Sequence, residues 1–402
     1  MTEQPSADSI EASLREKAWE LGFADIGITT AADPGHAEYL RSWLADGNHG
    51  EMAWLADPEA VRRRGDLGAT LEGVRSVIVV ADSYPASGSP DDPGQAILAR
   101  YARGRDYHLT LVDRLRDLGS LLGTEQGRGP NGGGAHGENG GAAPPGDRWT
   151  AYADTGPLLE RDLARRAGLG WFGRNTLLIH PKRGSYFLLG VILTTRELVP
   201  NDPFEDDHCG KCNACVDSCP TGALLGRNAD GAPVIDAKRC ISYLTIELRG
   251  AIPQELRPAI GTRVFGCDIC QEVCPWTVKF GAQQLAHPEY EAVAWPAGRE
   301  GDPALPSLDG PDLVEFTERV LAMSGKEYQR VFRESPLARP RRNGMLRNLC
   351  VALGNYGRTS AKAAERVRPV LERAVEDRSG LVRVHAEWAL TRSRDGQENQ
   401  AP

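Results

Sequence analysis

The spacing of hydrophobic residues along the first 200 positions switches repeatedly between a helical and an extended period. Helical spacing covers residues 10–18, 36–44 and about 108–122, whereas extended apolar runs cover 23–28 and 74–81. The run at 74–81 is apolar at nearly every position, which indicates a buried strand. Because helices and strands alternate, residues 1–200 are predicted to fold as an α/β domain.

The same alternation continues in the second half of this domain. A strand over 149–153 leads into Asp154-Thr155-Gly156-Pro157 and then into a helix over about 158–167. Proline suits the first turn of a helix, so Asp154 or Thr155 is expected to cap this helix. Two further apolar strands are predicted at 176–179 and 186–194.

Residues 123–147 interrupt the predicted α/β domain. Gly, Pro, Asn and Ala dominate this segment, and it has too few large apolar residues to pack against a core. It is therefore predicted to be a disordered surface insertion.

The C-terminal part of the chain is predicted to be helical. Apolar residues recur at helical spacing in three stretches, 346–353, 367–374 and 382–390. The last stretch resembles a HEAT-type repeat. The expected order of segments is therefore a cysteine-rich domain at 201–285, a proline-rich connection at 286–325 and a helical domain at 326–395.

Charge is unevenly distributed along the 402 residues. The net charge of −8 argues against a uniformly basic nucleic-acid surface. Between Lys326 and Arg373, however, twelve Lys or Arg stand against four Glu, which indicates either a partner surface or a solvated helix face. No apolar run approaches the roughly 18 residues of a membrane span. The first residues lack the basic and apolar regions of an export signal, so a cytoplasmic protein is expected.

Eight of the nine cysteines lie between Cys209 and Cys274. The first run follows the C-x2-C-x2-C-x3-C-P spacing of bacterial ferredoxins, and the second run is one cysteine short. In two-cluster ferredoxins the last cysteine of a run ligates the other cluster. The predicted ligand sets for two 4Fe-4S clusters are therefore Cys209, Cys212, Cys215 and Cys274 for the first, and Cys219, Cys240, Cys267 and Cys270 for the second.

Zinc and disulfide bonds are the alternatives for these cysteines. Zinc sites usually take four ligands in separated pairs, whereas the first run has three cysteines at successive i, i+3 spacing. Disulfides require an oxidising compartment, which a cytoplasmic protein does not meet. Cys350 stands apart at helical spacing with leucines and is expected to be a small core residue.

Seven motifs resemble those of the epoxyqueuosine reductase family, in the same order along the chain. Two of them are Asp154-Thr-Gly-Pro-Leu-Leu-Glu-Arg161 and Gly170-Trp-Phe-Gly-Arg-Asn-Thr-Leu-Leu178. The others lie at 21–27, 43–52, 101–108, 239–248 and 266–276. The resemblance covers about residues 10–280 and the helical tail.

This resemblance implies reduction of the epoxide of epoxyqueuosine to the alkene of queuosine at the wobble position of tRNA. It also implies a cobalamin-binding α/β (α+β) domain related to nitroreductase-like folds, a ferredoxin-like two-cluster domain and C-terminal HEAT-like helices. The implied cofactors are two 4Fe-4S clusters and cobalamin. Because Leu111 replaces the glycine in the Asp-x-His-x-x-Gly motif that begins at Asp106, a base-off cobalamin without a histidine ligand is expected. An external one-electron donor is implied as well, and the protein is expected to be a monomer.

The resemblance assigns Asp154 as the proton donor, and desolvation is expected to keep its carboxyl group protonated. The cluster bound by the set that includes Cys240 is expected to lie nearest the cobalt. The residues implied to contact cobalamin are Arg64, Asp106, Tyr107, His108, Asp154, Gly173, Arg174, Asn175, Leu178, Ser242, Asp268 and Ile269.

The resemblance implies that the partner of the basic stretch is tRNA. Arg339, Arg341, Arg342 and Arg347 are predicted to track the phosphates of the tRNA. Two other functions remain open from the sequence: a corrinoid reductive dehalogenase, and a non-catalytic ferredoxin-type subunit that passes electrons to a separate enzyme.

Overall fold

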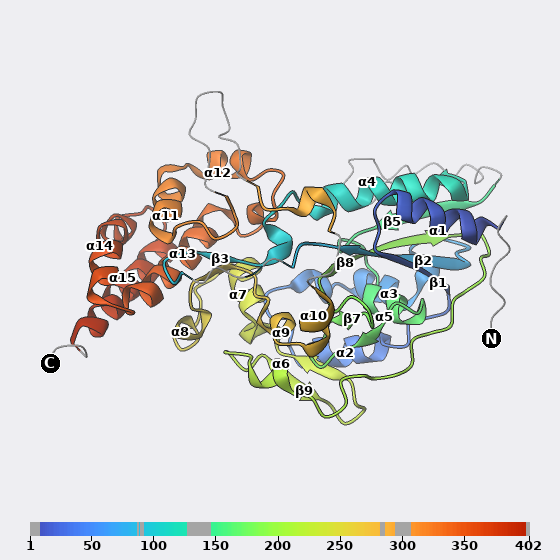
Figure 1. The fold of residues 1–402 in the computed structure, drawn as a ribbon, viewed down its shortest axis with the longest axis horizontal. Helices are drawn as coiled ribbons and strands as arrows, with labels where there is room; N and C mark the ends of the chain where they lie inside the picture. The colour runs from blue at the N-terminus through green and yellow to red at the C-terminus, as the bar shows by residue number, and fades with distance from the viewer. Residues whose placement is uncertain are drawn as a thin grey trace.

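A five-stranded sheet forms the centre of the N-terminal half in the computed structural model of the protein (Figure 1). The structure describes residues 9–86, 88, 92–126, 146–281, 286–293 and 307–398. Neighbouring strands are antiparallel, except that β4 runs parallel to β5 at the edge. The strands, in spatial order, are β1 (Asp25–Thr30), β2 (Ser76–Ser83), β8 (Phe187–Thr194), β5 (Arg148–Tyr152) and β4 (Thr124–Glu125).

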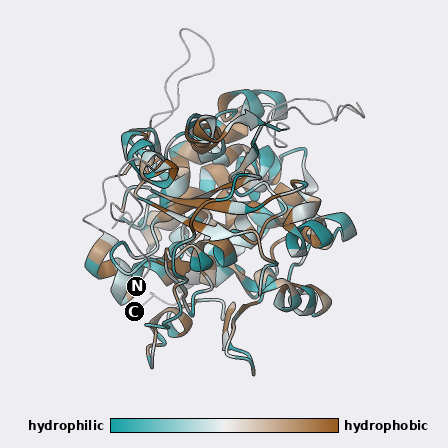
Figure 2. Cartoon of the chain, turned by 90° about the vertical axis from the view of Figure 1, so that its right-hand side faces the viewer, coloured by the Kyte–Doolittle hydropathy of each residue, from teal (hydrophilic) through white to brown (hydrophobic). Residues whose placement is uncertain are grey.

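Helices cover both faces of this sheet (Figure 1). Every residue of β2 is buried, and its side chains alternate between two hydrophobic cores. Ile78 and Val80 pack with α1 (Ile10–Glu20) and α4 (Tyr107–Gly119) on one face, while Val77 and Val79 pack with α5 (Glu160–Arg166) on the other. In Figure 2 the hydrophobic residues, in brown, gather on the strands in the middle of the molecule.

The structure confirms most of the helices and strands that the sequence predicts in this half. The predicted elements at 10–18, 23–28, 74–81 and 186–194 correspond to α1, β1, β2 and β8. The strand predicted at 176–179 is shorter, β7 (Leu178–Ile179), and pairs with β6 (Trp171–Phe172). The helix predicted at 36–44 is α2 (Ala37–Ala45), which is followed by α3 (Pro58–Gly65).

One boundary prediction is wrong. The helix expected from residue 158 begins only at Glu160, and its cap residue is Leu159, which makes no side-chain capping bond. Asp154 instead has a φ of 61°, a left-handed conformation that is uncommon outside glycine. The chain therefore turns at Asp154, and the side chain of Asp154 is not used to cap the helix.

The predicted insertion lies only partly within the described residues. Thr124–Glu125 at its start form β4 and pair with β5, so these two residues are ordered against the sheet. Residues 127–145, most of the segment, lie outside the described residues.

Short elements build the cysteine-rich region between the sheet and the C-terminal helices (Figure 1). The helices that carry the two cysteine runs, α6 and α9, contact each other. The region is tied to the sheet domain by β11, which pairs in parallel with β3 (Ile97–Leu98). Its elements are α6 (Ala214–Asp217), β9 (Leu224–Arg227), β10 (Pro233–Ile235), α7 (Ile241–Ile246), α8 (Arg257–Ile260), β11 (Arg263–Phe265), α9 (Ile269–Glu272) and α10 (Pro275–Phe280).

Five helices form the C-terminal part, and their apolar faces share one core. The three predicted amphipathic stretches are confirmed as parts of α13, α14 and α15. Within the segment assigned to a connection, α11 also forms and packs against α13. The helices are α11 (Leu313–Ala322), α12 (Gly325–Val331), α13 (Arg341–Gly357), α14 (Ala361–Val375) and α15 (Gly380–Glu398). Among the described residues, no helix is both long and apolar enough to cross a membrane.

Helix α13 is fastened to the cysteine-rich region by polar side chains that are fully buried. The Arg347 guanidinium donates to the carbonyl oxygens of Leu244, Leu248 and Gly250 at 2.7–2.8 Å. The Asn348 amide donates to two more carbonyl oxygens, those of Thr245 and Val264. Since Arg347 is 0 % exposed, the prediction that it contacts tRNA phosphates is wrong.

Candidate functional site

Two neighbouring cavities lie between the sheet domain and the cysteine-rich region. The larger has a volume of about 480 Å³ and the smaller about 300 Å³. Residues from the β5–α5 turn, the start of α5, the loop before β7 and the end of β10 line both cavities and form a shared wall. The residues common to both are Asp154, Glu160, Arg161, Thr176 and Ile235.

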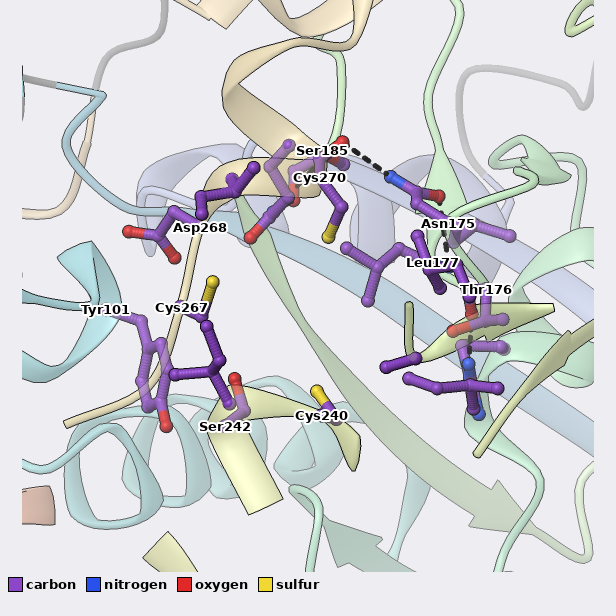
Figure 3. Close-up of a pocket in the computed structure, with 18 of the residues that line it drawn as sticks. Tyr101, Asn175, Thr176, Leu177, Ser185, Cys240, Ser242, Cys267, Asp268 and Cys270 are labelled. Atoms are coloured by element: carbon purple, nitrogen blue, oxygen red, sulfur yellow. Dashed lines mark hydrogen bonds between the residues drawn. The ribbon is translucent and has the colours of Figure 1, made fainter. Parts of the chain in front are cut away.

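The structure brings together the members of each predicted cluster set. The four cysteines that line the larger cavity are Cys219, Cys240, Cys267 and Cys270. Figure 3 shows the sulfur atoms of Cys240, Cys267 and Cys270 around the same open space, opposite Asn175 and Leu177. The other four line a separate small cavity near α6 and α10, and they are Cys209, Cys212, Cys215 and Cys274.

Each set supplies the four thiolates that one four-iron cluster requires, and each set lies around one cavity. Within the part of the chain that the structure describes, no group of three His, Cys, Asp or Glu side chains is arranged to hold a single metal ion.

One thiol in each set, Cys215 in the first and Cys267 in the second, is difficult to ionise without a metal. Burial and the nearby thiols of Cys209 and Cys274 raise the pKa of Cys215 to about 11. Burial is also the main reason why the pKa of Cys267 is raised to about 12. Cluster binding must therefore displace protons from these thiols.

Asp154 carries the carboxylate at the junction of the two cavities. Its Oδ2 atom accepts a hydrogen bond of 2.8 Å from the Tyr107 hydroxyl and lies 3.5 Å from His108 Nε2. His108 Nδ1 in turn lies 2.7 Å from Asp106 Oδ1. The Asp154 side chain is 65 % accessible. Because Asp154 lines both cavities, this accessible surface faces the cavities.

The protonation of this group differs from the sequence-based expectation. Burial acts to raise the pKa of Asp154, but its hydrogen bonds with His108 and Tyr107 outweigh burial and lower the pKa overall. Burial opposes the charge on His108, yet Asp106 and Asp154 raise the pKa of His108 to about 9. The prediction that desolvation keeps Asp154 protonated is therefore wrong, because its partner at neutral pH is an imidazolium.

Glu160 is a functional candidate that the sequence analysis missed. Its Oε1 atom accepts a 2.8 Å hydrogen bond from the backbone N–H of Asp154, and it lines both cavities. Burial, reinforced by the charge of Asp154, raises the pKa of Glu160 to about 8. An acidic residue in the first turn of a helix is ordinary, so only the fold of the Asp154 turn identifies it.

The residues predicted to contact a cofactor fall into three groups. The larger cavity is lined by Tyr107, Asn175, Leu178, Ser242, Asp268 and Ile269, and Arg64 lines the smaller one. Asp106 and His108 lie behind Asp154 and support it. Gly173 and Arg174 lie toward the other cysteine set, where Arg174 donates to Asn213 Oδ1 at 2.5 Å and to the Gly210 carbonyl at 2.7 Å.

The arginines predicted to contact tRNA divide into buried and exposed pairs. Arg342 joins Arg347 as a buried residue, because its guanidinium pairs with Asp377 Oδ2 at 2.7 Å. The prediction of a phosphate contact is therefore wrong for both. Arg339 and Arg341 are exposed, and Arg339 also pairs with Glu247 at 3.0 Å.

Two family models match separate parts of the chain. A 4Fe-4S double cluster binding domain matches residues 208–277, which contain all eight cysteines of the two sets. The model described as epoxyqueuosine reductase QueG, DUF1730, matches residues 64–133.

Curated relatives cover nearly the whole chain. The epoxyqueuosine reductase of Pseudomonas aeruginosa is 38% identical over 413 residues, covering 98% of this chain and 99% of the relative. That of Alicycliphilus denitrificans is 37% identical, covering 94% and 96%.

Solved structures agree with these matches. A crystal structure of epoxyqueuosine reductase with an epoxyqueuosine-modified tRNA-Tyr stem loop aligns with a TM-score of 0.75 at 26% identity, covering 98% of this chain and 95% of that one. A structure of the Bacillus subtilis epoxyqueuosine reductase, with an aspartate catalytic loop swung out of the active site, has a TM-score of 0.73 at 26% identity and covers 97% and 93%.

Proposed function

The chain belongs to the epoxyqueuosine reductase family, and we propose that its larger cavity binds cobalamin and that Asp154 delivers a proton to the epoxide oxygen. The protein is an oxidoreductase that reduces epoxyqueuosine to queuosine in tRNA. One observation carries the proposal: four predicted cluster thiols and Asp154 line the same cavity. The thiols of one predicted cluster and the proposed proton donor therefore face the same cavity.

The residues around the larger cavity fit the proposed cofactor. Its lining combines the thiols with leucines and with the polar side chains of Asn175, Ser242 and Gln271, which suits a large macrocycle bearing amide groups. We propose that cobalamin binds base-off and without a histidine ligand, since Asp106-Tyr-His108 starts an Asp-x-His-x-x-Gly motif in which Leu111 stands at the glycine position. When bound, the clusters supply single electrons and cobalamin a strongly reduced metal centre.

Conversion of an epoxide to an alkene takes up two electrons and two protons and releases one water. The epoxide oxygen must be protonated as its C–O bond breaks, because an alkoxide is a poor leaving group. We assign this transfer to the Asp154 carboxyl group. Since Asp154 is ionised at rest, it first takes a proton from the imidazolium of His108, to which its Oδ2 atom lies 3.5 Å away. Tyr107 holds the carboxylate in place through the same oxygen.

This route predicts a specific dependence of the rate on pH. His108 is protonated below its pKa of about 9 and neutral above it, so turnover should fall as the pH rises through about 9. Burial lowers this pKa, and Asp106 and Asp154 raise it. Asp106→Asn removes one of the hydrogen bonds that favour the imidazolium, so the alkaline limb should move to lower pH. Rate profiles of wild type, Asp106→Asn and His108→Gln would test this, and three coincident limbs would contradict it.

Further proposals concern the fold relationships, the location, the oligomeric state and the electron donor of the protein. The C-terminal helices are proposed to be HEAT-like, and the α/β domain is proposed to be related to nitroreductase-like folds. The protein is proposed to act in the cytoplasm as a monomer and to receive electrons from an external one-electron donor.

Anaerobic reconstitution tests the function directly. The full chain is loaded with iron, sulfide and cobalamin, supplied with a strong reductant, and incubated with epoxyqueuosine-containing tRNA. Nucleoside mass spectrometry should show epoxyqueuosine replaced by queuosine. The proposal for cobalamin fails if enzyme loaded with clusters alone is equally active. The assigned function fails if the fully loaded protein leaves epoxyqueuosine unchanged.

A further inference from the structure

An exposed tryptophan lies beside the cavities and is stacked with an arginine. The Trp54 side chain, in the 3-10 turn Ala53–Leu55, remains 45 % exposed. The guanidinium carbon of Arg339 lies 5.1 Å from the centre of its ring. Large aromatic side chains are usually covered in a folded protein, so an exposed tryptophan stacked with arginine needs an explanation.

The position of this pair relates it to the cavities. Leu55, the next residue along the chain, lines the smaller cavity, and its carbonyl oxygen accepts a hydrogen bond from Arg64. On the other side, the positive charge of Arg339 helps to lower the pKa of Asp154. Trp54 and Arg339 therefore lie at the rim of the two cavities that Asp154 lines.

Further positive charge surrounds the pair. Arg249, whose side chain is 46 % exposed, donates to the carbonyl oxygen of Arg339 at 2.8 Å. Arg341 is exposed at the start of α13. Two carboxylates lie among these groups: Glu247, which is 18 % exposed and pairs with Arg339 at 3.0 Å, and the exposed Glu51, which accepts from the Arg249 backbone N–H. The three guanidinium groups of Arg249, Arg339 and Arg341 outnumber them.

We infer that Trp54 and Arg339 form a stacking platform for an anticodon-loop nucleotide next to the substrate base, and that Arg249 and Arg341 bind the flanking phosphates. The inference rests on the proposed function and adds an RNA subsite to it. A base that reaches Asp154 must leave the stack of its loop, and its neighbour then loses a stacking partner. Aromatic rings and guanidinium planes are the usual replacements in single-stranded RNA recognition.

Binding of a fluorescent anticodon stem loop to the cluster-loaded full chain tests the platform without requiring turnover. Trp54→Ala should weaken binding by about 10- to 100-fold, whereas Trp54→Phe should retain most of it. Trp19→Ala is the matched control, because Trp19 is 62 % exposed on α1, away from the cavities, and its loss should leave binding unchanged. In steady state, Trp54→Ala should raise KM far more than it lowers kcat.

The salt dependence separates the phosphate contacts from the stacking contact. Arg249→Ala and Arg341→Ala should each flatten the plot of log affinity against log salt concentration by about 0.7, the value for one phosphate on a single strand. Trp54→Ala should lower affinity at all salt concentrations with the slope unchanged. If Trp54→Ala lowers Tm, Trp54→Leu provides the decisive comparison, since it keeps apolar contact but lacks an aromatic face.

The possible failures are distinguishable. If wild type binds the stem loop and Trp54→Ala or Trp54→Leu binds equally well, the platform is wrong while the proposed function stands. If wild type neither binds nor reduces the modified RNA, the proposed function itself is wrong.

Discussion

Replacing Asp154 by asparagine should lower the turnover of epoxyqueuosine in tRNA by about 10²- to 10⁴-fold, the usual contribution of a general acid. An amide cannot transfer a proton from His108 to the epoxide oxygen. It can still accept the hydrogen bond from Tyr107, so the walls of both cavities should remain in place. Single-turnover assays with nucleoside mass spectrometry would measure the loss.

Asparagine is the informative replacement because of the backbone at this position. Asp154 has a φ of 61°, and asparagine tolerates this region better than alanine does. Iron content, bound cobalamin and Tm should therefore match those of wild type. Asp113→Asn, an exposed carboxylate on α4, is the matched control and should keep full activity. Full turnover by the Asp154→Asn variant would remove this residue from the mechanism.

Replacing Cys240 by alanine should abolish turnover and remove about half of the iron, because each four-iron cluster requires four thiolates. Cys240 lines the larger cavity with three other thiols and is the member of its set that belongs to neither cysteine run. The cluster of the first set has its own four cysteines and should remain. Iron and sulfide analysis, together with electron paramagnetic resonance of the reduced protein, would distinguish the two clusters.

Cys350→Ala provides the matched control for this experiment. Cys350 is buried in the core of the C-terminal helices, with no exposed surface, and it lines neither cluster cavity. Its replacement should leave the iron content and the reduced spectrum unchanged. Retention of all eight irons by the Cys240→Ala variant would show that another residue provides the fourth ligand.

Sequence was sufficient for the grouping of the cysteines and for the main elements of the sheet domain. The requirement for four thiolates per cluster limits the possible ligand sets, and the structure brings those same sets together. The buried strand β2 was also predictable, because burial of both of its faces leaves a continuous apolar run.

The protonation of Asp154 could not be predicted from its sequence neighbours. It depends on His108, which is 46 positions away in the chain and reaches Asp154 only through the fold. Glu160 escaped detection for a related reason, since it reaches back to the Asp154 backbone only because the helix starts later than expected. The charge of a group in a cleft depends on its partners in space.

The burial of Arg347 in the C-terminal helices could not be predicted from the sequence either. In sequence it belongs to a basic stretch, and a positive charge on an amphipathic helix usually faces solvent. Helix α13 is instead buried on almost all sides, and its polar residues satisfy carbonyl groups of another segment. Burial of that kind depends on what packs around the helix, which the period of its own residues does not specify.

The attachment of α13 also determines the order in which the protein can be completed during synthesis. The carbonyl groups that Arg347 and Asn348 bind belong to α7 and the residues after it, the segment that begins at Cys240. Their donors lie 84 to 103 positions further along the chain. In a chain still growing on the ribosome, the cysteines from Cys209 to Cys274 are therefore synthesised before Arg347 and Asn348. The carbonyl groups of α7, the helix that Cys240 precedes, therefore lack these partners until α13 has been synthesised.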